Sequence, residues 1–521
     1  MPPDLIKLQR SPRDTHRWQK AQQQLLSGRQ NQALPSYRDL ARRFPGVVQL
    51  WFELGIAAAN DLDFALADQA FHRAEQLAPT DVSLLVLLGQ QYHRLQRLEK
   101  ARGCFERAVA ADPGSVHAQL SLASWFERER RLDDAWKSVT ACLAKHPRDP
   151  QVRCVQAQLL HRKGRNAEAE NVLRDLVAAD SPDANVKISS RHLLAVVLDG
   201  LGQYAEAFKW LHESKELARK TTNTSRLEKE YDLADERRRQ LLRELTSEMI
   251  RRWREESAVE PGSQRIAFLG GHPRSGTTLL EQILGAHPGV AAFDEPDAFV
   301  QEVWNQLAPM PATHSLNASG LNNLPTARRA ELRGRYFKSL GREPTGKSAA
   351  EVLLDKNPSP TASLHLWLRV FPELKVIIAL RDPRDVIVSC YFQNLMMTST
   401  NANFLTLERA AKHYADLMDV WLRLRELGGF DWIETRYENV VKDLEAEGRR
   451  VTQFLGLAWD PRQAKYYESA AQKVLFAPTY NDVANPVHAR AVGRWQHYAE
   501  AIAPIQEKLA PYCRAFGYPA A

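Results

Sequence analysis

One spacing constrains the fold of the first part of this chain. Four prolines recur every 34 residues, at Pro45, Pro79, Pro113 and Pro147. Small residues keep the same interval in two series, which are Ala21, Gly55, Gly89, Ala123 and Ala157, and Ala67, Ala101, Ala135 and Ala169. A unit of this length holds two helices, and small side chains let the helices approach closely. We therefore expect a stack of helix pairs, each burying its apolar face against its neighbours.

The pattern resembles the tetratricopeptide repeat. Phe71 and Phe105, each followed three positions later by alanine, fit the second helix of that repeat. We predict an all-α solenoid over residues 14–220, whose last repeat is lengthened or acts as a cap because extra residues follow Pro182. The resemblance implies a concave surface for a protein or peptide partner. A role limited to solubilising or dimerising the second domain is the alternative.

A charged segment follows the repeats. The segment from residue 225 to 260 is rich in arginine and glutamate, and apolar residues such as Tyr231 and Leu241 recur near helical spacing. This pattern predicts one amphipathic connecting helix with a solvated charged face. Pro261-Gly262-Ser263 then marks a boundary, so we expect a second domain over residues 262–521.

The second domain begins with an anion-binding pattern. An apolar strand, residues 265–269, leads into the turn from Gly270 to Gly276 and then into a helix. The spacing from Gly271 to Gly276 fits a P-loop, but Thr277 stands where the lysine of a nucleoside-triphosphate site belongs. Backbone N–H groups can still cradle a phosphate ester, whereas kinase chemistry is disfavoured.

A second apolar strand, residues 374–380, ends at Arg381, and Ser389 follows eight positions later. Ligands bind at strand ends in open α/β sheets. The guanidinium and the hydroxyl, about two helical turns apart, can converge on one phosphate.

Together the two segments resemble the paired cofactor motifs of sulfotransferases that use 3′-phosphoadenosine 5′-phosphosulfate (PAPS). The similarity extends through most of residues 262–500 and is greatest to the group containing the protein-tyrosine sulfotransferases. Shorter matches are residues 355–358, 436–439 and 493–495. The resemblance implies an α/β P-loop sulfotransferase domain with a parallel sheet flanked by helices.

The resemblance also implies a site for PAPS as cosubstrate. The loop would hold the 5′-phosphosulfate, Arg381 and Ser389 the 3′-phosphate, and Tyr437 would border the adenine. The whole implied set is Arg274, Ser275, Gly276, Thr277, Thr278, Arg381, Ser389, Tyr437, Arg494 and Trp495. The last two, with Arg490, lie in a segment that often closes over the cofactor in relatives. No metal is expected, because the P-loop lysine is absent and no clustered acidic pair follows a strand.

The same resemblance implies catalytic roles for two residues. Glu295 occupies the place of the family's glutamate base and would take the proton of the acceptor hydroxyl. Lys356 would stabilise negative charge on the leaving oxygen. Four other side chains remain alternatives for the base: Asp294, Asp297, His272 and His287.

Composition sets outer limits on function. The formal charge of +7 favours anionic ligands, but the basic residues are dispersed, so a nucleic-acid partner is not expected. The five cysteines are scattered and predict buried thiols instead of disulfides or zinc. Neither a membrane span nor a secretory signal is evident, which predicts a cytoplasmic protein.

The predicted activity is PAPS-dependent transfer of a sulfuryl group to a hydroxyl. A protein or peptide tyrosine is slightly favoured as acceptor because of the repeats, and a saccharide or small molecule is the alternative. A repeat scaffold that binds nucleotide without turnover is the alternative from a different class.

Overall fold

The computed structural model describes residues 3–26, 30–61, 63–95, 97–257, 265–307, 316–342, 352–470 and 483–519. The chain forms two compact units, Met1–Ser181 and Pro182–Ala521.

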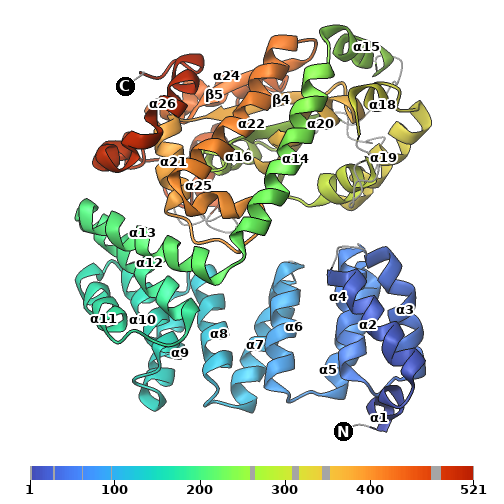
Figure 1. Ribbon diagram of the computed structural model, residues 1–521, viewed down its shortest axis with the longest axis vertical. Coiled ribbons are helices and arrows are strands. Elements are labelled where there is room, and N and C mark those ends of the chain that lie inside the picture. The colour runs from blue at the N-terminus through green and yellow to red at the C-terminus, as the bar shows by residue number, and fades with distance from the viewer. Residues whose placement is uncertain are drawn as a thin grey trace. The chain divides into compact units, whose positions relative to one another are not determined.

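The first unit consists of helices joined by short turns, coloured blue to teal in Figure 1. They are α1 (Pro3–Gln9), α2 (Pro12–Leu26), α3 (Gln30–Arg43), α4 (Val48–Asn60), α5 (Phe64–Leu77), α6 (Val82–Arg94), α7 (Leu98–Ala111), α8 (Val116–Arg128), α9 (Leu132–Lys145), α10 (Pro150–Arg162) and α11 (Asn166–Ala178). Successive helices pack as pairs, and one apolar cluster runs from Leu8 to Leu159. The predicted helical solenoid is confirmed.

The 34-residue period has a direct packing cause. A Cβ placed on Gly55 would lie 2.4 Å from Cδ1 of Phe71, and one placed on Gly89 would lie 2.6 Å from Cε1 of Phe105. Both distances are too short for real contacts, so each aromatic ring of a second helix rests on the bare backbone of the first. Small residues at these positions are therefore required by the close approach of the paired helices.

The second unit starts with helices that the sequence pattern assigned to the solenoid or to a connecting helix. They are α12 (Ala184–Gly200) and α13 (Tyr204–Thr221), which pack as a pair, followed by α14 (Thr224–Glu244) and α15 (Ser247–Ser257). The division between the units therefore falls at 181/182 and not near residue 220, where the repeat pattern ends. The reason is that Ala195 and Leu211 are buried in the same hydrophobic cluster as the core of the second unit.

The prediction of a single connecting helix over residues 225–260 was wrong. The helix ends at Glu244, because Leu245 has an extended backbone (ψ 139°), and a second helix starts at Ser247. Leu241, Leu242 and Leu245 are buried in the core of the second unit, so the segment is part of that unit. The predicted boundary at Pro261–Ser263 lies outside the described residues.

A five-stranded sheet forms the centre of the second unit. Its strands are β1 (Arg265–Gly271), β2 (Val290–Asp294), β3 (Val352–Lys356), β4 (Lys375–Leu380) and β5 (Asp431–Arg436). The order is β2-β3-β1-β4-β5, and all paired neighbours are parallel. The predicted parallel sheet is thus confirmed. Since all strands point the same way, the ends of β1, β2, β3 and β4 meet at one edge of the sheet.

Helices cover both faces of this sheet. They are α16 (Thr277–Gly285), α17 (Asn305–Leu307), α18 (Ala318–Asn322), α19 (Thr326–Ser339), α20 (Leu364–Val370), α21 (Pro383–Tyr391), α22 (Leu407–Leu427), α23 (Tyr437–Lys442), α24 (Leu444–Phe454), α25 (Tyr466–Ala470) and α26 (Ala499–Ala515). Short π- and 3₁₀-helices lie among them: η1 (Val300–Trp304), η2 (Ser359–Ser363), η3 (Asn401–Leu405), η4 (Pro461–Lys465) and η5 (Arg494–Tyr498).

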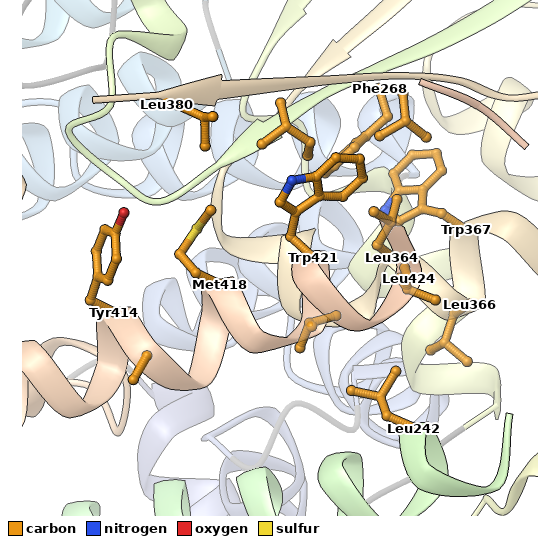
Figure 2. Packing of buried hydrophobic residues seen from close by; sticks show 14 of the residues in the cluster. Leu242, Phe268, Leu364, Leu366, Trp367, Leu380, Tyr414, Met418, Trp421 and Leu424 are labelled. Carbon is orange, nitrogen blue, oxygen red and sulfur yellow. The ribbon is translucent and has the colours of Figure 1, made fainter. Parts of the chain in front are cut away.

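The strands are apolar on both faces because both are covered. On one face Phe268 of β1 and Leu380 of β4 lie in a cluster with Trp367 of α20 and Trp421 of α22, as Figure 2 shows. On the other face Ala267, Leu269 and Ile377 pack in a cluster with Leu280 of α16 and Val451 of α24. Alternate strand residues therefore serve opposite layers.

Two compositional predictions can be compared with the structure. The five cysteines are free; four of them are buried and Cys154 is half-buried. In the part of the chain that the structure describes, no helix combines the length and apolarity needed to cross a membrane.

Candidate active site

The loop between β1 and α16, which the sequence predicts to cradle an anion, lies at the edge of the sheet. Gly271 has a φ of 127°, and a Cβ there would lie 2.3 Å from the carbonyl oxygen of Ala379, so only glycine fits. Gly276, with a φ of 89°, is the N-cap of α16, and among the described residues no side chain caps that helix. The first N–H groups of α16 are therefore available to an anion.

Arg274 occupies an unusual backbone conformation within this loop. Its φ is 74°, in the left-handed region that non-glycine residues rarely adopt. Its Nε donates a hydrogen bond to Oγ of Ser389 at 3.0 Å, and its carbonyl accepts one from Nη1 of Arg381 at 3.2 Å. The two sequence motifs that predicted anion binding are thus in direct contact.

Arg381 follows the end of β4 and is almost fully buried, with 6% of its surface exposed. Its Nη2 donates to the carbonyl of Ala491 and lies 3.8 Å from the carboxylate of Asp385. Its Nε is buried and has no hydrogen-bond partner among the described residues. A buried guanidinium N–H without a partner is costly, which indicates that a ligand oxygen belongs there.

These elements line a pocket of about 460 Å³. The predicted site residues on its wall are Arg274, Gly276, Thr277, Thr278, Glu295, Arg381, Ser389, Tyr437 and Arg494. Three predicted residues do not line it: Ser275, Lys356 and Trp495. Further lining residues, which the sequence did not indicate as ligands, include Leu395, Asn401, Phe404, Tyr466 and His488.

Tyr437 sits against the loop at the start of α23. A Cβ on Gly276 would lie 2.6 Å from Cδ2 of the Tyr437 ring, and the Arg381 guanidinium lies 5.0 Å from the centre of the same ring. The aromatic face and the cation are therefore adjacent, an arrangement that favours both. Tyr437 thus borders the two anion-binding motifs.

The proposed base and cation meet at the ends of β2 and β3. Nζ of Lys356 donates to Oε1 of Glu295 at 2.9 Å and also forms an ion pair with Asp294. The strand register explains this, because Asp294 and Lys356 are paired across the two strands and the backbone N–H of Glu295 donates to the carbonyl of Lys356 at 2.8 Å. Glu295 has a φ of 49°, so a second left-handed residue lies at the site.

Exposure differs sharply within this group. The Lys356 side chain is 0% exposed, whereas that of Glu295 is 46% exposed. Burial on its own would lower the pKa of Lys356, but the carboxylates of Glu295 and Asp294 outweigh it, and the pKa lies above its ordinary value. Lys356 is therefore a buried, charged side chain that binds the carboxylate of Glu295, which faces the pocket.

The alternative bases differ in their surroundings. His272 is buried, Nδ1 donates to the carbonyl of Pro273 at 2.8 Å, and Nε2 accepts from Nδ1 of His413 at 2.9 Å. His287 accepts the N–H of Gly289 at Nδ1 and donates from Nε2 to the carbonyl of Ala458. Both histidines therefore use both ring nitrogens within the fold. Asp297 is exposed and does not line the pocket.

The C-terminal segment is tied to α21 by Asp385. This carboxylate accepts the N–H groups of Gly493 and Trp495, each at 2.8 Å. The Trp495 ring lies 3.8 Å from the guanidinium of Arg384. Trp495 was predicted to contact the cofactor, but it does not line the pocket. Its ring packs against α21 instead. Arg494, by contrast, does line the pocket.

Thr361 is a further supporting residue that the sequence did not indicate. Its Oγ1 accepts the N–H of Gly271 at 2.9 Å and bonds to the carbonyl of the same residue at 3.2 Å. No local motif marks a threonine that acts 90 positions away. Asp385, in contrast, lies between Arg381 and Ser389 in the sequence and could have been found from that motif.

The donor set fits a ligand with two anionic groups. One group of donors is the loop with the start of α16, and the other is Arg381 with Ser389. Among the described residues, no group of three or more His, Cys, Asp or Glu side chains is arranged to hold a metal ion. The fold and the pocket thus define an α/β domain with a pocket at the ends of parallel strands, where ligands bind in open α/β sheets.

Comparison with known proteins names the family. Residues 267–461 match the model of the sulfotransferase family, and residues 20–82, 86–139 and 126–184 match that of the tetratricopeptide repeat. The second unit therefore contains a region similar to the sulfotransferase family, and regions similar to the tetratricopeptide repeat precede it. Both predicted assignments are confirmed.

Individual relatives are distant. An uncharacterised protein of Aquifex aeolicus is 27% identical over 353 residues, which is 66% of this chain and 44% of that protein. Protein-tyrosine sulfotransferase A of Caenorhabditis elegans is 24% identical over 267 residues, or 48% of this chain and 66% of that protein. Among solved structures, the sulfotransferase domain of the Synechococcus PCC 7002 olefin synthase is 21% identical, covers 50% of this chain and 98% of that domain, and has a TM-score of 0.35.

Proposed function

We propose that this protein transfers a sulfuryl group from PAPS to an acceptor hydroxyl. The observation that carries the proposal is the junction of the two motifs, where Arg274 donates to Ser389 beside Nε of Arg381, which is unpaired within the described parts of the chain. Within one pocket the chain offers separate donors for two anionic groups, which a 3′,5′-substituted adenosine carries.

The residues that would hold the nucleotide follow from these donors. The loop and the N-terminus of α16 would hold the 5′-phosphosulfate, Arg381 and Ser389 the 3′-phosphate, and Tyr437 would border the adenine. Arg494 lines the same pocket and would add positive charge. When bound, PAPS supplies an activated sulfuryl group and leaves as adenosine 3′,5′-bisphosphate.

Glu295 is the proposed base. It lines the pocket, and its ion pair with Lys356 fixes the carboxylate in one orientation. A fixed carboxylate at the pocket wall can accept the proton of an acceptor hydroxyl.

Lys356 supports the same reaction with its charge. Because its pKa is raised, the ammonium stays protonated at neutral pH, and although it does not line the pocket its charge beside Glu295 can stabilise negative charge that develops there. Asp294 keeps an ion pair with this ammonium when Glu295 becomes neutral on taking the proton.

The acceptor is proposed from the relatives. Proteins of Caenorhabditis elegans and Danio rerio that share 24% and 25% identity with this chain are named protein-tyrosine sulfotransferases. A tyrosyl hydroxyl is therefore the first acceptor to test, and a saccharide or small molecule is the alternative. We propose that the repeats recruit the protein or peptide that carries the acceptor. The cytoplasmic location stays a prediction from the sequence.

Calorimetric titration tests the proposal directly. Adenosine 3′,5′-bisphosphate is added without metal, and ATP with magnesium is titrated in parallel. Tight binding of the bisphosphate and little response to ATP support the proposal, whereas a preference for ATP contradicts it. Transfer from PAPS is then measured on a tyrosine peptide, a saccharide and a phenol. Binding without transfer to any acceptor would favour a non-catalytic repeat scaffold.

A further inference from the structure

The helix pair α12–α13 holds the C-terminal end of α21. Nε2 of His192, on α12, donates to the carbonyl of Phe392 at 2.9 Å, and Nζ of Lys215, on α13, donates to the carbonyl of Gln393 at 2.5 Å. Phe392 is the C-cap of α21 and Gln393 follows it, so the helix itself offers these carbonyls no partner and the two side chains satisfy them. All of these residues belong to the second unit.

Aromatic contacts fix the pair in place. The Phe208 ring of α13 lies 5.6 Å from that of Tyr391, at the end of α21. Tyr204 stacks on His497 of η5, with ring centres 4.0 Å apart and an angle of 14° between the planes. The pair therefore contacts both the helix that carries Ser389 and the segment that carries Arg494.

Asp199, near the end of α12, has the most direct link to the pocket. Its Oδ2 lies 2.9 Å from Nη2 of Arg494, and its Oδ1 accepts a hydrogen bond from the hydroxyl of Tyr498. The Arg494 guanidinium lies 4.3 Å from the centre of the Phe392 ring. The carboxylate and the ring together hold the arginine in one orientation at the pocket wall.

Orientation matters because an arginine side chain has many rotamers. Fixing such a side chain before a ligand binds removes the entropy cost of ordering it from the binding step. An arginine held by a carboxylate from another element is thus preorganised for an anionic ligand.

We propose that Asp199 is a positioning residue of the nucleotide site and acts through Arg494. The helix pair that follows the repeat array in the sequence is then part of the nucleotide-binding apparatus. This inference rests on the proposed function, since it concerns the affinity for PAPS and adenosine 3′,5′-bisphosphate. Residues 182–221 would then contribute to nucleotide binding and would not only connect the repeats to the rest of the chain.

A double-mutant cycle in the full chain tests the inference. The dissociation constant of adenosine 3′,5′-bisphosphate and the KM for PAPS are measured for Asp199→Asn, Arg494→Ala and the double variant. Asp199→Asn removes the charge but keeps an acceptor for Tyr498. We expect it to weaken bisphosphate binding about fivefold and to raise the KM for PAPS in parallel, with kcat within about twofold. In the Arg494→Ala background the same change should have less than about a twofold effect.

A matched variant separates positioning from stability. Leu211→Ala removes apolar packing from the core of the second unit but none of the contacts described for Asp199 or Arg494, so it should lower the Tm and leave the dissociation constant unchanged. If Asp199→Asn behaves like Leu211→Ala, or if its effect multiplies fully with that of Arg494→Ala, the inference is wrong. If the unchanged protein fails to bind the bisphosphate, the proposed function falls and the inference falls with it.

Discussion

Nε of Arg274 donates a hydrogen bond to Oγ of Ser389 at 3.0 Å, although the two residues are 115 positions apart. The contact arises because β1 and β4 are neighbours in the sheet, with Gly271 paired to Ala379. Each strand ends in one of the two motifs, so parallel pairing brings the motifs together. Loss of either motif should therefore affect the same ligand.

Replacement of Arg381 by alanine should weaken the binding of adenosine 3′,5′-bisphosphate by about 1.5–3 kcal/mol, because a buried charged donor is lost. Arg490→Ala is the charge-matched control, since Arg490 is exposed and does not line the pocket. Calorimetry on both variants checks the prediction. Equal losses for the two would mean that only net charge matters, and no loss for Arg381→Ala would remove it from the site.

Glu295→Gln should lower the rate of sulfuryl transfer about a hundredfold or more, because an amide cannot take a proton from the hydroxyl. Nucleotide affinity should stay unchanged. Asp294→Asn is the control, as it keeps the Glu295–Lys356 contact and removes only the second ion pair of the lysine. Steady-state rates with saturating PAPS distinguish the two. Near-normal turnover by Glu295→Gln would assign the base elsewhere.

Much of this site could be predicted from local sequence. Strand ends, glycine-rich turns and motif spacing are local signals that indicated the loop residues, Arg381 and Ser389, whereas Glu295 was implied by the family resemblance. The register of β2 and β3 then brought Asp294 beside Lys356, which no spacing could show. Asp199 and Thr361 escaped prediction for the same reason, because each acts on a residue far along the chain through tertiary packing.

The domain boundary illustrates a second limit of sequence patterns. The pattern of small residues continues into α12 and α13, so periodicity alone assigns them to the solenoid. Packing decides otherwise, because Ala195 and Leu211 are buried in the core of the second unit. Likewise, helical spacing at Leu241 and Leu242 does not reveal whether these side chains are buried or face solvent. The structure shows that both are buried in the core of the second unit.

Truncation distinguishes the two boundaries. A chain that begins at Pro182 keeps α12 and α13 and should stay monodisperse and bind adenosine 3′,5′-bisphosphate. A chain that begins at Thr224 exposes the ring of Tyr391 and leaves the carbonyls of Phe392 and Gln393 without their donors. It should aggregate or lose binding. Size-exclusion chromatography and calorimetry make the comparison, and equal behaviour of the two would show that the helix pair is dispensable.

Stability should fall as the pH decreases from about 6.5 to 4. Burial lowers the pKa of His192 and of His272 to about 4, and that of His413 well below its ordinary value. In this window the unfolded chain binds protons that the folded chain does not, so the free energy of unfolding decreases. Asp355 opposes the trend, since burial raises its pKa to about 7 and the folded state gains from its protonation.

The variant His413→Asn tests this pH dependence. The asparagine amide can still donate to Nε2 of His272, but it cannot be protonated. Urea unfolding at pH 7 and pH 5 should show a smaller difference in stability for the variant than for the unchanged protein. The same difference in both would mean that His413 makes no contribution to the acid sensitivity.

The repeat period should be testable with two glycines that differ only in their surroundings. Gly55 faces the Phe71 ring, whereas a Cβ on Gly103, inside α7, would meet nothing within 4 Å. Gly55→Ala should destabilise the first unit by about 1–3 kcal/mol through overpacking. Gly103→Ala should stabilise it by about 0.5–1 kcal/mol, because alanine loses less backbone entropy in a helix. Hydrogen exchange should become faster in α4 and α5 for the first variant and slower in α6 and α7 for the second. If both variants exchange more slowly, helix propensity and not the ring contact governs position 55, and the packing explanation of the 34-residue period fails.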